Sequence, residues 1–445
     1  MAANPTPQQA AAIARQGKVI VSASAGSGKT FVMIERLADY ISGGGDLDGV
    51  LAVTFTKKAA AQMKEKLRSA LIKRAAAAEG AERNRLKEQI GKISSANIST
   101  IHSFCGYLLR VYFYLLDIDG SFEIVSDDGG AEAQLRSRAM DALFERLYES
   151  EDEDFIYLLE RYGKKRSDGS LKRLISDAYD EVRNIPDYAE FLKRTADICD
   201  LTAFEGICAR LHGYAVQRCQ SLASELYDFA AEYPEMPQIC RKVMAEILSL
   251  LDAVRSQEDI FAPLPKFVTS RRPSVKKGEE PDPVTVDFFT LRDYIKGVYD
   301  KLYEGISDRQ SELDMFLSSG RSAHAFNNLL LEFDAEYASV KREEGKLDYG
   351  DMEHLTLRLL EDGGVLGEIA SRFKRVFVDE YQDVNPVQER IISLVGGENL
   401  FLVGDVKQAI YGFRGSKSVY FTKKTEEFAD FGNSLCLSHN FRSAP

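Results

Sequence analysis

The sequence of 445 residues is long enough for about three compact units, at ~150 residues per domain. Hydrophobic residues make up 44% of it and charged residues 28%, which is typical of a globular protein and too apolar for a disordered chain. The net charge of −12 argues against a protein that coats nucleic acid by bulk electrostatic attraction, because such binding depends on neutralising phosphates. Any contact with DNA must therefore come from particular residues.

The sequence shows no sign of a membrane or secreted protein. No run approaches the ~20 apolar residues that cross a bilayer, and the first residues lack the basic and apolar blocks of a secretion signal. The six cysteines contain no Cys-x-x-Cys pair, so they predict neither a disulfide scaffold nor a zinc ribbon. We expect a cytoplasmic protein without a membrane segment.

Short runs rich in β-branched residues occur near both ends of the sequence. Each is four or five residues long and nearly continuous in apolar character, as in buried parallel strands. Helical periodicity follows the early runs, at residues 29–41, 57–78 and 102–116. Strand, crossover helix and strand in succession predict an α/β fold with a parallel sheet. The expected strands are residues 18–22, 50–54, 97–100, 375–379, 399–403 and 434–437.

The middle of the sequence differs, because long amphipathic helical stretches replace the strand signals there. We therefore expect a large all-helical domain, residues 127–346, inserted into an α/β domain formed by residues 1–126 and 347–433. Residues 434–445 are expected to begin a linker to a second domain. Within the helical part, the proline-rich segment 261–277 interleaves basic and aromatic residues, a pattern that suits a nucleic-acid backbone.

A glycine-rich segment follows the first predicted strand and begins the first predicted helix. It reads Ala-Ser-Ala-Gly-Ser-Gly-Lys-Thr, a P-loop with alanine in place of the usual first glycine. Its glycines allow backbone N–H groups to surround phosphates at a helix N-terminus. We expect Lys29 to reach the β- and γ-phosphates of ATP and Thr30 to bind Mg²⁺. The predicted nucleotide-binding residues here are Ala23, Ser24, Ala25, Gly26, Ser27, Gly28, Lys29 and Thr30.

A second candidate for nucleotide chemistry is the apolar strand that ends in Asp379 and Glu380. We expect Asp379 to hold Mg²⁺ through water, and Glu380 to orient or deprotonate the attacking water. A strand ending in two acids is a weak signal by itself. Together with the P-loop it indicates a site that hydrolyses ATP.

Several segments resemble, in order, the motifs of one family. Asp379-Glu-Tyr-Gln-Asp383 is similar to the DExQD box of superfamily 1 DNA helicases of the UvrD/Rep type. The resemblance implies a RecA-like P-loop motor domain that couples ATP hydrolysis to movement along single-stranded DNA. The other segments that resemble motifs of this family are residues 52–61, 99–105, 347–352, 403–415 and 437–443.

The resemblance implies roles for further residues around the nucleotide. Gln9 matches the glutamine that reads the adenine edge, and Phe441 stands where a ring stacks on adenine. Gln408 and Arg442 match residues that approach the γ-phosphate. The predicted catalytic residues are Lys29, Asp379, Glu380, Gln408 and Arg442.

The family pattern also implies a set of DNA-contacting residues at the strand ends and just after motif III. Aromatic rings stack on bases of any sequence, at about 1–3 kcal/mol per base, which suits a motor that moves along arbitrary DNA. The predicted DNA-binding residues are Thr54, Phe55, Thr100, His102, Tyr411, Phe413 and Arg414.

Within this family, three segments (residues 22–30, 100–105 and 378–385) are more similar to the AddA branch than to UvrD. The 277 positions that separate His102 from Asp379 also favour the larger inserted domain of that branch. The AddA branch comprises helicase–nuclease subunits of double-strand-break repair complexes. The resemblance thus implies an AddB-like partner protein besides single- and double-stranded DNA.

The family's motifs V and VI and a nuclease carboxylate cluster do not occur in the sequence. We therefore expect the N-terminal part of a longer protein, which by itself binds ATP and DNA, hydrolyses ATP with low activity and does not unwind a duplex. Two alternatives stay open: a nucleotide-gated DNA-binding module without turnover, and a UvrD-type helicase that acts without a nuclease partner.

Overall fold

The computed structural model divides into two compact units, one formed by Met1–Phe191 and Leu329–Pro445 and the other by Leu192–Asn328. Within the part that it describes, no helix is both long enough and apolar enough to cross a membrane. The described residues are 5–24, 26–126, 130–163, 167–196, 199–274, 280, 282–362, 364–408, 418–439 and 441.

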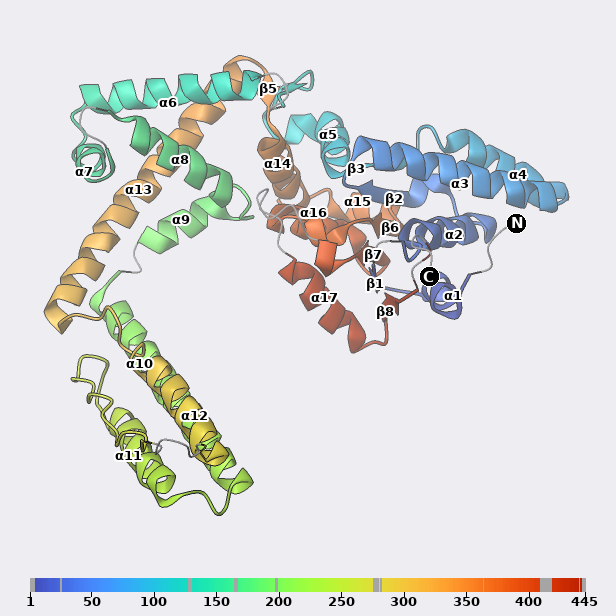
Figure 1. Cartoon of the computed structure of the whole chain (residues 1–445). Helices are drawn as coiled ribbons and strands as arrows, with labels where there is room; N and C mark the ends of the chain where they lie inside the picture. Colours follow the sequence, from blue (N-terminus) through green and yellow to red (C-terminus); the bar gives the residue numbers. More distant parts are fainter. Residues whose placement is uncertain are drawn as a thin grey trace. The chain divides into compact units, whose positions relative to one another are not determined.

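The first unit contains a six-stranded parallel sheet in the order β3-β2-β6-β7-β1-β8 (Figure 1). The predicted α/β class with a parallel sheet is thereby confirmed. Each of the six predicted strands is present within one residue of its expected position. The strands are β1 (Val19–Ala23), β2 (Val50–Thr54), β3 (Asn97–Thr100), β6 (Arg375–Val378), β7 (Leu400–Gly404) and β8 (Ser434–Leu437).

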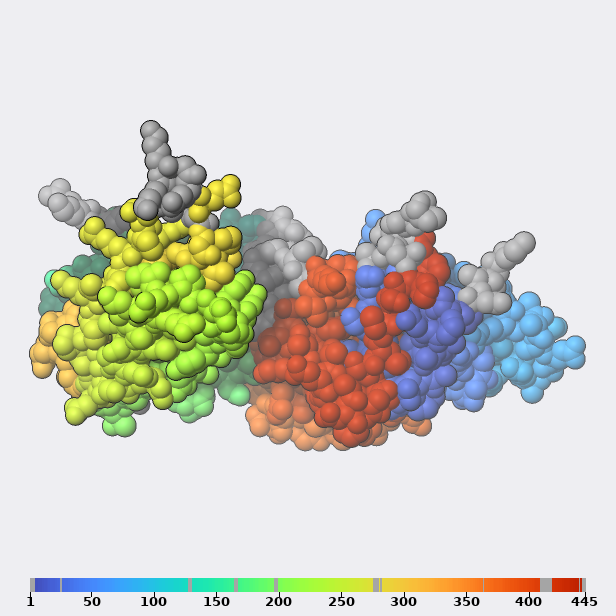
Figure 2. Space-filling view, turned by 60° about the horizontal axis from the view of Figure 1, so that its bottom comes forward, coloured from blue at the N-terminus to red at the C-terminus, as the bar shows by residue number. Residues whose placement is uncertain are grey.

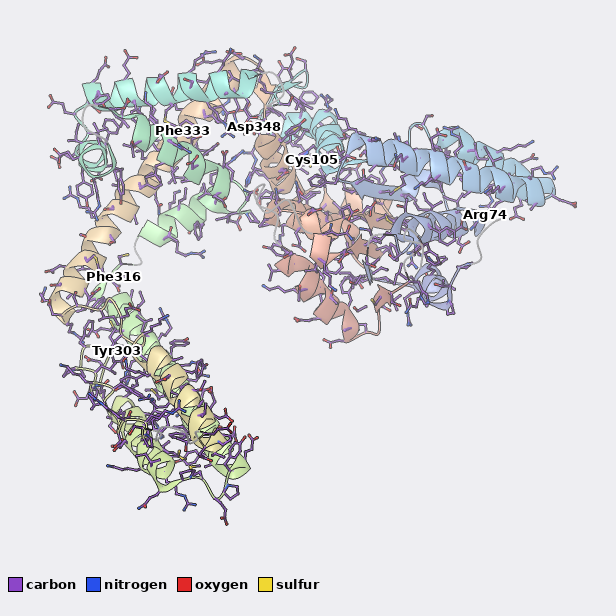
Figure 3. The ribbon with its side chains drawn as sticks, in the orientation of Figure 1. Arg74, Cys105, Tyr303, Phe316, Phe333 and Asp348 are labelled. Atoms are coloured by element: carbon purple, nitrogen blue, oxygen red, sulfur yellow. The ribbon has the colours of Figure 1, made fainter. Side chains whose placement is uncertain are left out.

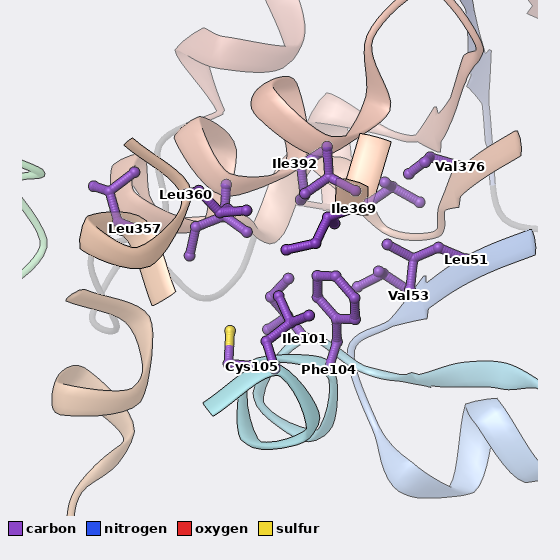
Figure 4. Packing of buried hydrophobic residues seen from close by; sticks show 14 of the residues in the cluster. Leu51, Val53, Ile101, Phe104, Cys105, Leu357, Leu360, Ile369, Val376 and Ile392 are labelled. Carbon is purple, nitrogen blue, oxygen red and sulfur yellow. The ribbon is translucent and has the colours of Figure 1, made fainter. Parts of the chain in front are cut away.

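Two hydrophobic cores cover the two faces of this sheet, because successive strand side chains point to opposite sides. Val19 and Val21 belong to one core and Ile20, between them, to the other. The first core includes α1 (Pro7–Ala14), α2 (Lys29–Ser42), α3 (Lys57–Ala77) and α4 (Gly80–Lys92). The second, part of which is seen in Figure 4, includes α5 (Ile101–Tyr112), α14 (Tyr349–Glu361), α15 (Leu366–Arg372), α16 (Pro386–Gly396) and α17 (Val419–Ala429).

Side-chain caps fix where three helices of the second core begin. The hydroxyl of Thr100, the last residue of β3, caps α5. Asp348 and Asp351 form a reciprocal capping box at the start of α14, and Asn385 and Gln388 form another at the start of α16. Such caps satisfy N–H groups that the first helical turn leaves unpaired. The starts of α5 and α16 are therefore well-defined points near the sheet.

A buried ion cluster joins α14 to the helical part of the same unit. Lys341 is only 2% exposed and lies 2.6 Å from carboxylate oxygens of both Asp348 and Asp351. Arg183 donates to Asp351 at 3.0 Å. Burial alone would raise the pKa of the Asp348 carboxyl, but Lys341 and Arg183 outweigh it and hold that pKa below its usual range (Asp348 is labelled in Figure 3).

Within this unit, a short pair of strands lies where the chain passes from the sheet to the helical part and back. β4 (Glu123–Ile124) pairs in parallel with β5 (Lys346–Leu347). The two compact units divide after Phe191 and after Asn328, whereas the sequence led us to expect domain boundaries at residues 127 and 346. The helices that follow β4 are α6 (Ala131–Glu149), α7 (Glu153–Tyr162), α8 (Gly169–Val182) and α9 (Tyr188–Ala196), and α13 (Arg309–Glu343) precedes β5.

The second unit is helical. Its helices α10 (Leu201–Glu232), α11 (Gln238–Arg255) and α12 (Pro283–Tyr299) pack around a core that includes Leu222 and Phe288 (green to yellow in Figure 2). The basic proline-rich segment lies between α11 and α12. Its described part, up to residue 274, forms neither helix nor strand.

One buried cation attaches α1, which carries Gln9, to α2. The guanidinium of Arg36 donates to the carbonyls of Ala12 and Ile13, at 3.0 and 2.9 Å, and lies over the ring of Phe401. Burial, aided by nearby Arg375, lowers the pKa of Arg36 to about 10. The side chain therefore caps the C-terminal end of α1 from within the core.

We expect Arg36→Met to lower the free energy of unfolding by about 1–3 kcal/mol, because two helix-end carbonyls lose their donor in a buried place. Chemical denaturation measures the change. Arg15→Met is the matched control, since Arg15 is exposed at the end of the same helix, and should change stability by less than about 0.5 kcal/mol. Equal stability of the Arg36 variant and the parent would contradict the capping role.

Candidate functional site

The predicted site elements meet at one edge of the sheet. β7 lies between β1 and β6, and all three run in parallel. Ser22 of β1 is in register with Gly404 of β7, and Val378 of β6 with Leu402. The carboxyl ends of these strands therefore bring together the P-loop after β1, the acid pair after β6 and the segment after β7. Ligands of open α/β sheets bind at such an edge.

The P-loop backbone adopts conformations that require glycine. Gly26 has φ = 79° and Gly28 has φ = 92°, both in the left-handed region. A Cβ atom on Gly28 would lie 2.5 Å from Nε2 of Gln9, so a side chain there would displace the Gln9 amide. The loop is tightened by the Ser27 hydroxyl, which donates to the carbonyl of Ser24 at 2.7 Å. Predicted Ala25 lies outside the described residues.

Gln9 supports the P-loop in this structure. Its Oε1 accepts from the backbone N–H of Thr6 at 3.0 Å, and its Nε2 donates to the carbonyl of Ser27 at 3.0 Å. Both ends of the amide are thus engaged with the protein. The predicted contact with adenine would require this amide to turn away from at least one partner.

Phe441 lies beside the same loop. Its backbone N–H donates to the carbonyl of Gly26 at 2.9 Å, while the side chain is 61% exposed. This position leaves the ring available to a ligand at the P-loop. The neighbouring Arg442, predicted to approach the γ-phosphate, lies outside the described residues.

The predicted lysine and base are in direct contact. Nζ of Lys29, the first residue of α2, donates to Oε2 of Glu380 at 2.7 Å. Glu380 itself has φ = 51°, a left-handed conformation that is uncommon for a residue with a side chain and that recurs at functional sites. Its backbone N–H donates to Oδ1 of Asp379 at 3.1 Å. Phosphates bound at the P-loop would compete with Glu380 for the Lys29 ammonium.

The side chains of Asp379 and Thr30, predicted to bind magnesium, offer oxygen donors of the kind that this ion takes. Burial and the adjacent Glu380 raise the pKa of Asp379 to about 6, so a nearby cation would favour its ionised form. Carboxylate and hydroxyl oxygens are ligands that Mg²⁺ prefers. In the described part of the chain, no group of three or more His, Cys, Asp or Glu side chains could hold a metal alone. In proteins, Mg²⁺ is commonly bound by one or two carboxylates together with the phosphates of a substrate.

A buried amide links the acid pair to the segment after β7. Gln382 donates through Nε2 to Oε2 of Glu380 at 2.9 Å, and its Oε1 accepts from the backbone N–H of Asp405 at 2.9 Å. The Asp405 carboxylate in turn accepts from the side-chain amide of Gln408. Predicted Gln408 is thus connected to Glu380 through two residues that were not among the predicted site residues. The sequence does mark Gln382 and Asp405, because each is a polar residue soon after a predicted strand and inside a segment that resembles a family motif.

The predicted DNA residues at the ends of β2 and β3 also lie together. Thr54 is in register with Thr100, and both side chains are buried. Their hydroxyls serve the fold: Thr54 donates to the carbonyl of Thr56 at 3.1 Å, and Thr100 caps α5. Phe55 follows directly and is partly exposed. The other predicted DNA-contacting residues, Tyr411, Phe413 and Arg414, lie outside the described residues.

His102 is held by a carboxylate that was not among the predicted site residues. Its Nε2 lies 2.8 Å from Oε1 of Glu353, and its ring centroid lies 4.4 Å from that of Tyr349. Glu353 is 4% exposed and also accepts from Asn385 Nδ2 at 2.8 Å and Gln388 Nε2 at 2.7 Å. The sequence feature that could have indicated Glu353 is an acidic residue on the otherwise apolar face of α14.

These bonds decide the charge of Glu353. Burial would raise the pKa of its carboxyl, but the hydrogen bonds from His102, Asn385 and Gln388 outweigh burial and lower it. An ionised carboxylate only accepts hydrogen bonds, so the Nε2 of His102 carries the proton and donates it.

The parallel sheet and the loop after β1 define a P-loop protein with a RecA-like fold. The family model described as the UvrD/REP helicase N-terminal domain matches residues 4–429. The chain belongs to this family, as its motifs predicted.

The chain is also similar to curated proteins of the AddA type, each named as one subunit of an ATP-dependent helicase/nuclease. The protein of Bacillus licheniformis is 33% identical over 98% of this chain and 38% of its own length. Those of Lactobacillus acidophilus and Natranaerobius thermophilus are 31% and 30% identical, over 98% and 96% of this chain. The chain spans 36–39% of the length of these relatives. The predicted resemblance to helicase–nuclease subunits is confirmed.

The raised pKa of Asp379 gives a prediction for metal-free, nucleotide-free protein. Because the folded-state pKa of about 6 is above the unfolded-state value, ionised Asp379 costs stability at high pH, and this cost disappears as the carboxyl is protonated. Asp379→Asn should therefore stabilise the protein by up to about 3 kcal/mol at pH 8. The gain should fall as the pH decreases from about 6 toward 4.

Urea denaturation of the parent and the variant across this pH range, with a chelator present, measures the difference. Asp228→Asn, an exposed change on α10, should show no such pH-dependent gain. A gain that is the same at pH 8 and pH 4 would show that the Asp379 carboxyl does not titrate as proposed.

Proposed function

We propose that this chain is the ATP-binding motor domain of a DNA helicase, in which ATP hydrolysis drives movement along single-stranded DNA. The observation that carries the proposal is the contact of Lys29 with Glu380. These residues follow different strands and lie 351 positions apart in the sequence, yet their charged atoms are 2.7 Å apart. Membership of the UvrD/REP helicase family supports the same conclusion.

The contact suggests how binding prepares hydrolysis. The phosphates of ATP carry more negative charge than a single carboxylate, so they compete for the Lys29 ammonium and release Glu380. The released carboxylate, still held by the Gln382 amide at 2.9 Å, is then free to accept a proton from water. Thr30, and Asp379 through water, would hold Mg²⁺, which would supply positive charge to neutralise the transferring group.

Contact with DNA is proposed for the carboxyl ends of β2 and β3. Phe55 and His102 are partly exposed there, whereas Thr54 and Thr100 are buried and shape the edge through their local hydrogen bonds. Gln408 lies at the start of the segment that leads to Tyr411, Phe413 and Arg414, so the Gln382 connection would relate nucleotide binding to DNA contact.

We further propose an AddA-like role in double-strand-break repair, within a helicase–nuclease that includes an AddB-like partner protein. The supporting fact is the name of the relatives, each of which is described as one component of an ATP-dependent helicase/nuclease.

Steady-state ATP hydrolysis with and without oligo-dT tests the proposal. The parent should show DNA-stimulated turnover. Glu380→Gln should still bind ATP but lose about 10²–10⁴-fold in turnover, because it removes the proposed general base. Lys29→Ala should lose nucleotide binding as well.

Lys18→Ala is the matched control, since Lys18 stands at the start of β1 and pairs on the surface with Glu398 at 2.9 Å. It should leave turnover unchanged. A parent that binds ATP and oligo-dT but shows no hydrolysis would favour the alternative of a nucleotide-gated binding module.

A further inference from the structure

The Glu353 carboxylate receives hydrogen bonds from two helices that begin near the sheet edge. His102 is the second residue of α5, directly after β3. Asn385 and Gln388 are the N-cap and third residue of α16, which follows the Asp379-Glu380 pair. Glu353 itself lies on a third helix, α14. Figure 4 shows Cys105 of α5 and Leu357 and Leu360 of α14 among the side chains of the second core.

If residue 353 served only to stabilise the fold, a carboxylate would be unfavourable there. A buried ion loses hydration, and replacing buried ionic groups by well-packed apolar side chains is often neutral or stabilising. The neighbours on the same face of α14, Met352, Thr356 and Leu357, are also buried, so an apolar residue would fit the helix pattern. Unlike an apolar side chain, Glu353 forms directional hydrogen bonds. Its three donors approach at 2.7–2.8 Å and come from two other elements, α5 and α16.

We propose that Glu353 is a positioning residue that couples the nucleotide edge of the site to its DNA edge. Charge-assisted hydrogen bonds of this length weaken when stretched, so the first turns of α5 and α16 have to move together. A displacement that nucleotide binding causes after Glu380 is thereby passed through Asn385 and Glu353 to the imidazole of His102. This inference deepens the proposed function and rests on it.

The hydrogen-bond directions provide a specific test. Glu353→Gln places an amide N–H group against Nδ2 of Asn385, which is also a donor. Asn385 cannot simply flip, because its Oδ1 already accepts from the backbone N–H of Gln388 at 2.8 Å. Adding Asn385→Asp restores the match, since a carboxylate there can cap α16 and also accept from the introduced amide. The double variant keeps the total charge of the parent.

Glu361→Gln is the matched control. Glu361 and Arg390 form an ion pair at 2.8 Å that joins the same two helices, α14 and α16, but both residues are exposed. Exposed pairs contribute little. Loss of the Glu361–Arg390 pair should therefore leave the coupling between nucleotide binding and DNA binding unchanged.

The measurement is the affinity for oligo-dT, by fluorescence anisotropy, with and without a non-hydrolysable ATP analogue. The ratio of the two affinities is the coupling factor, for which about 5–150-fold is typical. We expect Glu353→Gln to bring this factor close to one, with less than about threefold change in DNA affinity when nucleotide is absent. The double variant should recover the parent's factor, a rescue that a purely structural role does not predict.

The outcomes separate the two levels of inference. A Glu353→Gln variant with the parent's coupling factor would overturn the role of Glu353, and so would a parent that binds both ligands without coupling. A parent that binds neither ligand would refute the proposed function itself. Should Glu353→Gln fail to fold, Gln388→Met removes one of the three bonds to Glu353, together with the 3.4 Å capping-box bond from the N–H of Asn385, and should lower the coupling factor in the same direction.

Discussion

The candidate site depends on the parallel pairing of β7 with both β1 and β6. This pairing places the strand that leads to Asp405 and Gln408 between the strand of the P-loop and the strand of the acid pair. Side chains at the three ends then have to interact over short distances, which the structure shows as Lys29 against Glu380 and as Gln382 against Asp405. A one-residue shift in the register would move every side chain to the other face and separate these groups.

The same edge contains groups that are costly for stability. Glu380 has a left-handed backbone, Asp379 has a raised pKa, and Glu353 is a buried ion. Local conflicts of this kind are tolerated where function requires them and the rest of the fold compensates. Here the compensation comes from the two apolar cores on either face of the sheet, which enclose strands with hardly any exposed side chains.

The sequence predicted the strands and the P-loop well, because both are local patterns. A buried parallel strand is a short apolar run, so the run at 18–22 corresponds to Val19–Ala23 in the structure. Contacts between distant segments were not predictable in this way. The double engagement of the Gln9 amide and the role of Glu353 both depend on partners that only the tertiary structure brings close. The two-residue pair of β4 and β5 is likewise too short to produce a periodic signal.

The two polar connections start from one short stretch of chain. Gln382, two positions after Glu380, connects to β7, and Asn385, three positions further, connects through Glu353 to α5. The 3-10 turn Tyr381–Asp383, which contains Gln382 and precedes Asn385, is buried, so it has little freedom to absorb a movement. A displacement of Glu380 on release from Lys29 would therefore reach both connections at once. In this arrangement the contact of one lysine with one carboxylate relates the state of the nucleotide to both proposed DNA-contacting regions.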